Sequence, residues 1–231
     1  MQTKQKLPLK MNELFWLFGN ILCAIGVALC TKSGFGLSMI AAPPFILNQY
    51  LVRFSSFFSQ GACEYVLQAV LLVIMCIIIR KFNWKYIFSF VTAFIFGNMV
   101  DAALWVLGGQ AVYQSLALRI GAFVVSEIVI SLSIACYFRT SLPLCVYELF
   151  VVAVADRFNT PTHKIKLIFD SSMLLLSVSL SLILFKDFVG VGIGTVIVTV
   201  VNSHLIRLWG ILLDKLFCKE PLFPKLIKAL N

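Results

Sequence analysis

The stretch LFWLFGNILCAIGVALC, residues 14–30, is the part of the sequence that decides the fold class. It carries no charged residue and reaches the length, about 17–25 residues, that an α-helix needs to cross the hydrocarbon core of a bilayer. Two further long apolar runs occupy residues 65–79 with their flanks and residues 169–185, the latter with Asp170 near its start. Several such runs in one chain predict a polytopic, all-α membrane protein.

The overall composition supports a membrane protein. Hydrophobic residues make up 61% of the 231 residues and charged residues 13%, and the mean hydropathy is +0.98. Soluble domains average about 45–50% apolar and about 25% charged residues, so a soluble fold could not bury this much apolar surface. The net charge is +9, but Lys and Arg lie at the ends of the apolar runs. This placement indicates membrane topology and a lipid bilayer as partner, with no nucleic acid.

Motifs for metal binding and catalysis are absent from the sequence. None of the seven cysteines forms a Cys-x-x-Cys pair, and most lie in apolar runs, where cysteine behaves as a small hydrophobe. The two histidines form no His-Glu-x-x-His motif, and no Gly-x-Ser-x-Gly frames a serine. We therefore expect no metal, no cofactor and no catalytic residue. Gly190, Gly192 and Gly194 open an apolar run, so we expect them to allow close helix packing or a bend rather than to bind a nucleotide.

Lys and Arg positions separate the apolar runs that cross the membrane from those that do not. Long runs lie near 13–31, 61–80, 86–107, 116–138, 164–186 and 189–213, and short ones near 37–52 and 142–155. Short runs are more typical of re-entrant, interfacial or buried segments. If they do not cross, fourteen of the nineteen basic residues lie inside and four outside. If both cross, Arg80, Lys81 and Lys85 move outside. We therefore expect six spans, with both termini in the cytoplasm of a bacterial-type inner membrane.

The two halves of the sequence match each other at an offset of about 107 residues. Residues 26–37 fall on 133–144, with Lys32 on Arg139. The polar residues that coincide within the spans are Asn20 with Glu127, Glu64 with Asp170, Asn98 with His204, and Asp101 with Arg207. Three crossings in each half would make the second half enter from the opposite face, which is the inverted repeat of many transporters and some channels.

This repeat divides the chain into five parts. They are a cytoplasmic tail (1–12), a first membrane repeat (13–107), an external loop (108–115), a second membrane repeat (116–213) and a cytoplasmic tail (214–231).

Short glycine motifs lie at the end of the first span of the first half. Residues 26–29, Gly-Val-Ala-Leu, precede Ser33-Gly34-Phe35-Gly36, and the second copy at 133–136 and 140–143 has lost its glycines. These motifs resemble those of the YczE/YitT family of bacterial membrane proteins. Further matches are the pair Lys166 and Asp170, the Gly-Ile-Gly-Thr of 192–195, Gly97 with Asp101, and Glu148, which stands where the family has an Asp. The resemblance covers nearly the whole chain. It implies a six-span or similar fold in the cytoplasmic membrane, and it implies no defined activity.

Polar residues within spans are costly to bury and are candidates for a transport pathway. The expected topology places Glu64, Asp101, Glu127 and Asn98 toward the outside, with Lys32 and Arg53 as partners. It places Asn20, Asp170, His204 and Arg207 toward the inside, with an Asp170–Arg207 pair. Glu148 is a further candidate, or it ends its segment in water. These residues would form two polar layers, whose outer carboxylates attract a cation or proton. Alternatively, each residue only bonds a neighbouring helix.

These observations predict a small-solute or ion transporter or channel-like protein that is coupled to protons and is not an enzyme. One alternative is a membrane scaffold or accessory protein without transport activity. Another is the substrate-binding membrane subunit of a larger importer. A second copy of the chain or an accessory protein is the expected protein partner. No motif in the sequence specifies the transported substrate.

Overall fold

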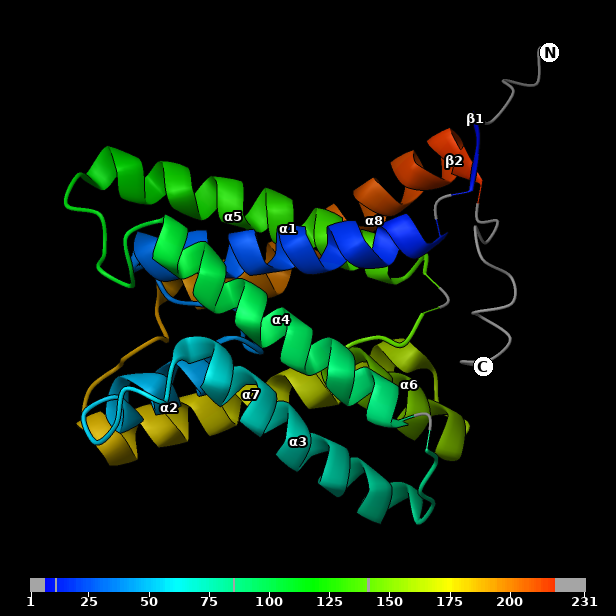
Figure 1. Ribbon diagram of the computed structural model, residues 1–231, viewed down its shortest axis with the longest axis horizontal. Helices are drawn as coiled ribbons and strands as arrows, with labels where there is room; N and C mark the ends of the chain where they lie inside the picture. Colours follow the sequence, from blue (N-terminus) through cyan, green and yellow to red (C-terminus); the bar gives the residue numbers. More distant parts are fainter. Residues whose placement is uncertain (1–6, 11, 85, 141, 219–231) are drawn as a thin grey trace.

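The computed structural model describes residues 7–10, 12–84, 86–140 and 142–218, and it is a bundle of α-helices (Figure 1). The predicted all-α membrane fold is confirmed. The elements are β1 (Leu7–Lys10), α1 (Asn12–Ser33), α2 (Ala42–Leu51), α3 (Gln60–Ile79), α4 (Tyr86–Val106), α5 (Leu116–Tyr137), α6 (Val146–Arg157), α7 (Thr162–Phe185), α8 (Ile193–Leu216) and β2 (Phe217–Cys218).

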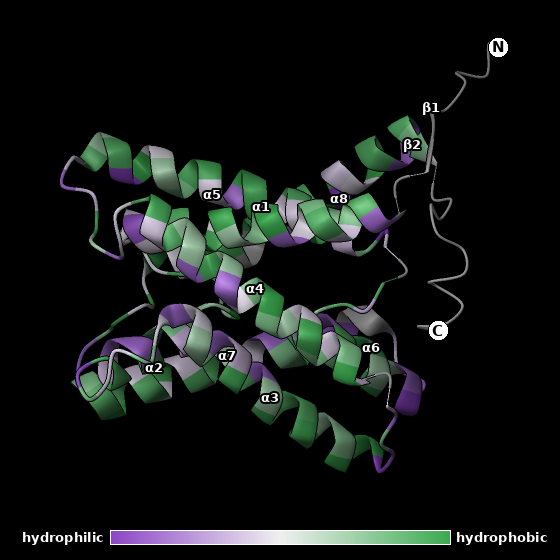
Figure 2. Ribbon diagram, in the orientation of Figure 1, coloured by the Kyte–Doolittle hydropathy of each residue, from purple (hydrophilic) through white to green (hydrophobic). Residues whose placement is uncertain are grey.

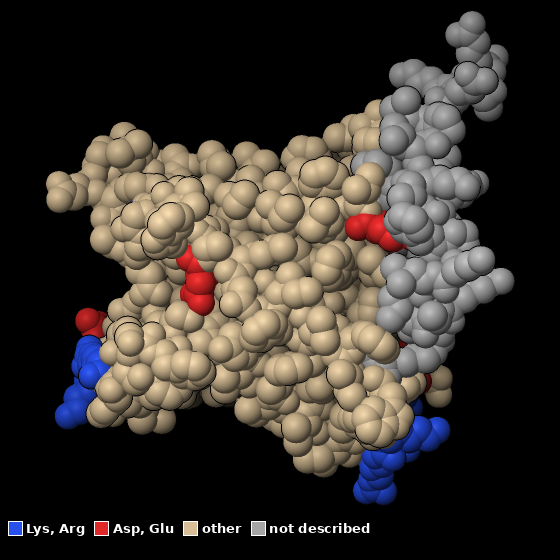
Figure 3. All heavy atoms as spheres, in the orientation of Figure 1, with Lys and Arg blue, Asp and Glu red and all other residues tan. Residues whose placement is uncertain are grey.

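Five helices in the described part of the chain are long and apolar enough to cross a membrane, namely α1, α3, α4, α5 and α7. Helix α8 has 24 residues and runs alongside them, but it is not among the five, so the sixth span remains a prediction. Figure 2 shows hydrophobic residues along the lengths of these helices and hydrophilic residues mainly at their ends and in the connecting loops. On the face in Figure 3, the Lys and Arg side chains gather near the two ends of the molecule. This distribution fits an apolar belt that faces lipid.

The order of a long helix, a short helix and two long helices occurs twice along the chain. Helices α1 and α5 pack against each other, and α1 packs on α4 as α5 packs on α8. The short helices follow the same rule, because α6 packs on α3 as α2 packs on α7. The internal match that the sequence suggested therefore coincides with equivalent packing partners.

The short helices α2 and α6 each return toward the end at which the preceding long helix stopped (Figure 1). After α1, residues 34–41 run back toward the middle of the bundle, and α2 starts there. After α5, the chain likewise turns back before α6 begins. Gly34 and Gly36 have φ angles of +67° and +106°, which permit the first reversal. Pro43 and Pro44 occupy the first turn of α2, where a missing N–H is tolerated.

The first and last described segments lie together. Strand β1 pairs in parallel with β2, next to the last turn of α8. Residues 1–6 and 219–231, which make up most of the two predicted cytoplasmic tails, lie outside the described residues.

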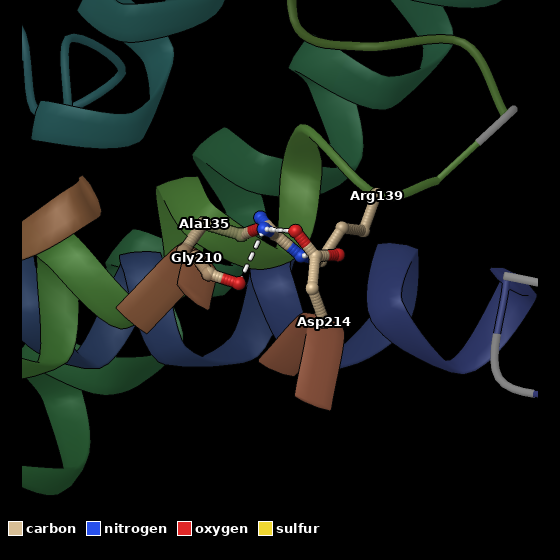
Figure 4. A network of polar contacts seen from close by, with 4 residues as sticks. All are labelled: Ala135, Arg139, Gly210 and Asp214. Carbon is tan, nitrogen blue, oxygen red and sulfur yellow. Dashed lines mark hydrogen bonds and ion pairs between the residues drawn. The ribbon is translucent and has the colours of Figure 1, made fainter. Parts of the chain in front are cut away.

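Arg139, directly after α5, fastens that helix to the end of α8 (Figure 4). Its Nε and Nη2 atoms donate to the two carboxylate oxygens of Asp214 at 3.0 and 2.7 Å. Nη2 also donates to the Gly210 carbonyl at 2.6 Å, and Nη1 donates to the Ala135 carbonyl at 2.8 Å. Lys32, its match in the first half, donates to the Gly109 carbonyl, in the loop after α4, at 3.1 Å. The two cations thus have equivalent structural roles.

We expect Arg139→Lys to destabilise the bundle, because a lysine cannot reproduce the fork that holds Asp214 and two carbonyls at once. The loss of charge-assisted hydrogen bonds should lower the free energy of unfolding by about 1.5–3 kcal/mol. Thermal unfolding in detergent measures this effect. Arg157→Lys, at the exposed end of α6, is the control and should leave Tm unchanged. Equal Tm values for the two variants would contradict the anchoring role of Arg139.

Helices α3 and α4 touch at their backbones through Gly61 and Gly97. A Cβ atom on Gly61 would overlap the Gly97 carbonyl oxygen, and a Cβ on Gly97 would lie 2.6 Å from the Gly61 oxygen. Gly61→Ala should therefore force the helices apart and lower the free energy of unfolding by about 1–3 kcal/mol. Gly121→Ala is the matched control, because nothing lies within 4 Å of a Cβ atom there. A lower Tm for Gly121→Ala than for Gly61→Ala would show that the close contact between Gly61 and Gly97 is wrong.

Candidate functional site

A cavity of about 50 Å³ lies where the N-terminal ends of α2 and α6 meet the long helices. Space of this size holds a few water molecules or one small ion with water, since one water needs about 10–15 Å³ on the same measure. Its walls come from both halves of the chain. The polar and thiol-bearing lining residues are Cys23, Ser38, Glu64, Tyr137, Cys145, Tyr147 and Glu148, and the rest of the lining is apolar.

Glu64 of α3 is the deepest acidic residue at this cavity. Its side chain is 4% exposed, and Oε1 accepts a hydrogen bond of 3.3 Å from the Tyr147 hydroxyl of α6. Glu148 follows Tyr147 and also lines the cavity, and its buried Oε2 has no hydrogen-bond partner among the described residues. Two carboxyl groups from different halves therefore line one cavity.

Tyr137 adds a hydroxyl from the last turn of α5. The residue is 2% exposed, and its hydroxyl interacts with the Cys145 thiol but has no partner in hydrogen-bond geometry within the described ranges. A buried hydroxyl without a partner costs free energy unless something else satisfies it. Its place in the cavity wall makes a bound water or ligand the natural partner.

Several backbone donors at the two short-helix N-termini are already used or missing. The Val146 N–H of α6 donates to Gln68 Oε1 of α3 at 3.0 Å. In α2, the Ala42 N–H donates to the Ser38 carbonyl at 2.9 Å, and Pro43 and Pro44 have no N–H. These four positions therefore offer no free donor to the cavity, although helix N-termini often bind anions.

An ion pair on α7 lies close enough to Glu148 to act on its charge. Lys166 Nζ lies 2.7 Å from Asp170 Oδ1, one helical turn away. Both charges act on the Glu148 carboxyl. The sequence suggested Arg207 as the partner of Asp170, but the structure pairs Asp170 with Lys166. Among the described residues, no group of three or more His, Cys, Asp and Glu is placed to hold a metal ion.

Asp101 caps the start of α3. Its carboxylate accepts from the Ser59 hydroxyl and, at 2.8 Å, from the Gly61 N–H. A carboxylate at a helix N-terminus is favoured by the helix dipole, so the structure gives Asp101 an architectural role. Lys32, expected as a partner of the outer carboxylates, lies instead on the Gly109 carbonyl and 5.0 Å from the Tyr113 ring centroid. Arg53 lies over the Phe185 ring.

The other predicted candidates do not line this cavity. Glu127 is 6% exposed, and neither carboxylate oxygen has a hydrogen-bond partner among the described residues. Asn20 is fully buried and donates to the Trp16 carbonyl at 2.8 Å. Asn98 is exposed and donates to the Phe94 carbonyl, and His204 and Arg207 are exposed on α8. Of the nine candidates, the structure brings only Glu64 and Glu148 together at the cavity.

Sequence reasoning missed Tyr137 and Tyr147. Both lie in apolar surroundings where an aromatic residue is expected to pack, and no motif marks their hydroxyls. The available signal for Tyr147 was its position beside Glu148 in a broken segment, and Tyr137 had none.

The two glycine motifs of the sequence lie against each other. The Leu37 N–H donates to the Gly190 carbonyl at 2.9 Å, and the Gly194 N–H donates to the Phe35 carbonyl at 2.9 Å. A Cβ atom on Gly36 would lie 2.6 Å from the Gly192 nitrogen. The predicted close packing at Gly190–Gly194 is confirmed. In the second half, where the glycines are lost, Pro143 instead accepts side-chain hydrogen bonds from Trp16 and Thr92.

Comparison with known proteins places the chain in a family without assigning it an activity. Residues 10–210 match the model of DUF6198, described as a family of unknown function. The chain is 23% identical over 210 residues to the "Uncharacterized protein YyaS" of Bacillus subtilis (strain 168). The aligned region covers 91% of this chain and 98% of that protein. No solved structure matches. The YczE/YitT name remains a resemblance, while the match over residues 10–210 shows that this chain belongs to the DUF6198 family.

Proposed function

We propose that this chain is a transporter or channel for a small solute or ion, with its pathway between the two halves. The observation that carries the proposal is the cavity at the meeting point of α2 and α6, which is lined by the buried Glu64 of the first half and the half-buried Glu148 of the second, whose Oε2 atom is buried. Broken helices that meet within a membrane bundle are typical of binding sites in transporters. A scaffold has no evident use for two costly carboxyl groups around one cavity.

The proposed membrane arrangement is an inverted repeat in a bacterial cytoplasmic membrane. Helix α1 would start on the cytoplasmic side, at the end of the bundle where α3 and α6 also end (Figure 1), and basic residues lie at the ends of these two helices, namely Arg80 and Lys81 after α3 and Arg157 in α6. Helices α2 and α6 would re-enter from opposite faces, because their preceding helices stop at opposite ends of the bundle. Cytoplasmic enrichment of Lys and Arg supports this orientation.

Proton coupling is part of the proposal, because the carboxyl groups of Glu64 and Glu148 can exchange protons with a pathway that reaches the cavity. The lining contains no Lys or Arg among the described residues, so the site favours a cation, a proton or a neutral polar solute over an anion.

Flux measurements in vesicles that contain only this chain test the transport role. Wild-type protein should support uptake of a proton, an alkali cation or a polar solute from a screened set. Glu64→Gln and Glu148→Gln should each reduce that flux at least about tenfold, as expected when a group used in the pathway is removed. Asp156→Asn, on the exposed end of α6, is the control and should keep wild-type flux.

Two results would decide against transport by the chain alone. An absence of flux together with a stable non-enzymatic partner favours a scaffold, and recovery of a nucleotide-hydrolysing partner favours an importer subunit. Wild-type flux in both Glu64→Gln and Glu148→Gln would mean that the cavity is not part of the transport pathway.

A further inference from the structure

We propose that the cavity binds a small monovalent cation, an alkali-metal ion or ammonium, in competition with protons on Glu64 and Glu148. The inference deepens the proposed transport role and rests on it for the use of the site. The binding itself can be measured without any flux.

The hydrogen-bonding groups that remain free in the cavity are mainly acceptors. Glu148 Oε2 has no partner within the described residues, and Glu64 has a hydrogen bond to Tyr147 at only one of its oxygens. The Val146 and Ala42 N–H groups, which could have held an anion, are bonded to Gln68 and Ser38. The unpartnered Tyr137 hydroxyl supplies a further oxygen. The carboxylate oxygens accept hydrogen bonds and carry charge, and the Tyr137 hydroxyl oxygen can also accept, so the site favours a cation over an anion.

The charge at the site is not balanced by the protein. With both carboxyl groups ionised, the cavity carries two negative charges, whereas Lys166 and Asp170 form their own pair. Burial of an uncompensated carboxylate is expensive, so the site must gain protons or a cation. The titratable and charged groups around the pair are Cys23 of α1, Tyr137 of α5, Cys145 and Tyr147 at the start of α6, and Lys166 and Asp170 of α7.

Size and ligand number favour a monovalent ion. A volume of about 50 Å³ accommodates one small cation with a few waters. Calcium usually takes six to eight oxygen ligands. Two carboxyl groups and two phenol oxygens provide fewer strong ligands than such an ion needs, and they suit a singly charged ion that keeps part of its hydration.

Thermal unfolding of the purified full chain in detergent tests the site directly. At pH 8, NaCl, KCl or NH₄Cl should raise Tm by about 2–4 °C or more above choline chloride at equal ionic strength. The half-saturating concentration of the effective ion should rise about tenfold for each unit of pH decrease, as expected when one cation displaces one proton. Glu148→Gln should abolish the ion-specific rise, and Asp156→Asn should retain it.

Tyr137→Phe provides a second test if Glu148→Gln fails to fold. It removes only the hydroxyl and should raise the half-saturating concentration severalfold. Equal Tm values in all four salts for the wild-type chain, or an unchanged ion response in Tyr137→Phe and Glu148→Gln, would overturn the cation site. A pH-dependent Tm without ion selectivity would also overturn it, in favour of proton binding alone. Cation binding without flux would reject the transport role and leave the cation site intact. Flux without cation binding would reject the cation site and leave the transport role intact.

Discussion

The constraint on which the structure depends is that every backbone polar group inside a bilayer needs a partner. Two helices of this chain, α2 and α6, start inside the bundle, where lipid offers no hydrogen bonds. Their first N–H groups are satisfied by Ser38 and Gln68 or eliminated by Pro43 and Pro44. This local solution is what allows the chain to reverse twice, and the two reversals bring their ends to one cavity.

The same constraint explains why polar groups collect at that place. The Gln68 side chain of α3 accepts a hydrogen bond from the first N–H group of α6, and the Tyr147 hydroxyl of α6 donates to Glu64 of α3. Glu148 lies next to Tyr147 in the first turn of α6. Arg139 and Lys32 hold the ends of α5 and α1 to the loops and helices next to them. The close glycine contacts between residues 34–37 and 190–194 hold the first reversal in place. The site is therefore a consequence of how the broken helices are supported.

Much of the fold could be predicted from the sequence, because strongly apolar runs of spanning length have few structural alternatives. Short segments near 37–52 and 142–155 were separable by their length and prolines, and the structure has α2 and α6 there. The candidate site was harder to predict, since polar residues within spans say nothing about which helices meet. Asp101 was predicted to belong to the pathway because a carboxylate is costly within a membrane span, yet it caps α3 by accepting hydrogen bonds from Ser59 and Gly61. Tyr137 resembled a packing residue until the return of the chain before α6 placed its hydroxyl in the cavity wall. Long-range contacts of this kind depend on tertiary packing, which single-sequence patterns do not encode.

The most direct test of this account is the sidedness of the segments on either side of each short helix. Single cysteines at Ser56, Asn83, Ala111 and Asp156, all exposed, would be placed in a cysteine-free chain and labelled in intact bacteria with an impermeant thiol reagent. The account predicts labelling at Ser56 and Ala111, and at Asn83 and Asp156 only after permeabilisation. Labelling of Asn83 without Ser56 and Ala111 would mean that α2 and α6 cross the membrane, and it would contradict the two reversals on which the site depends.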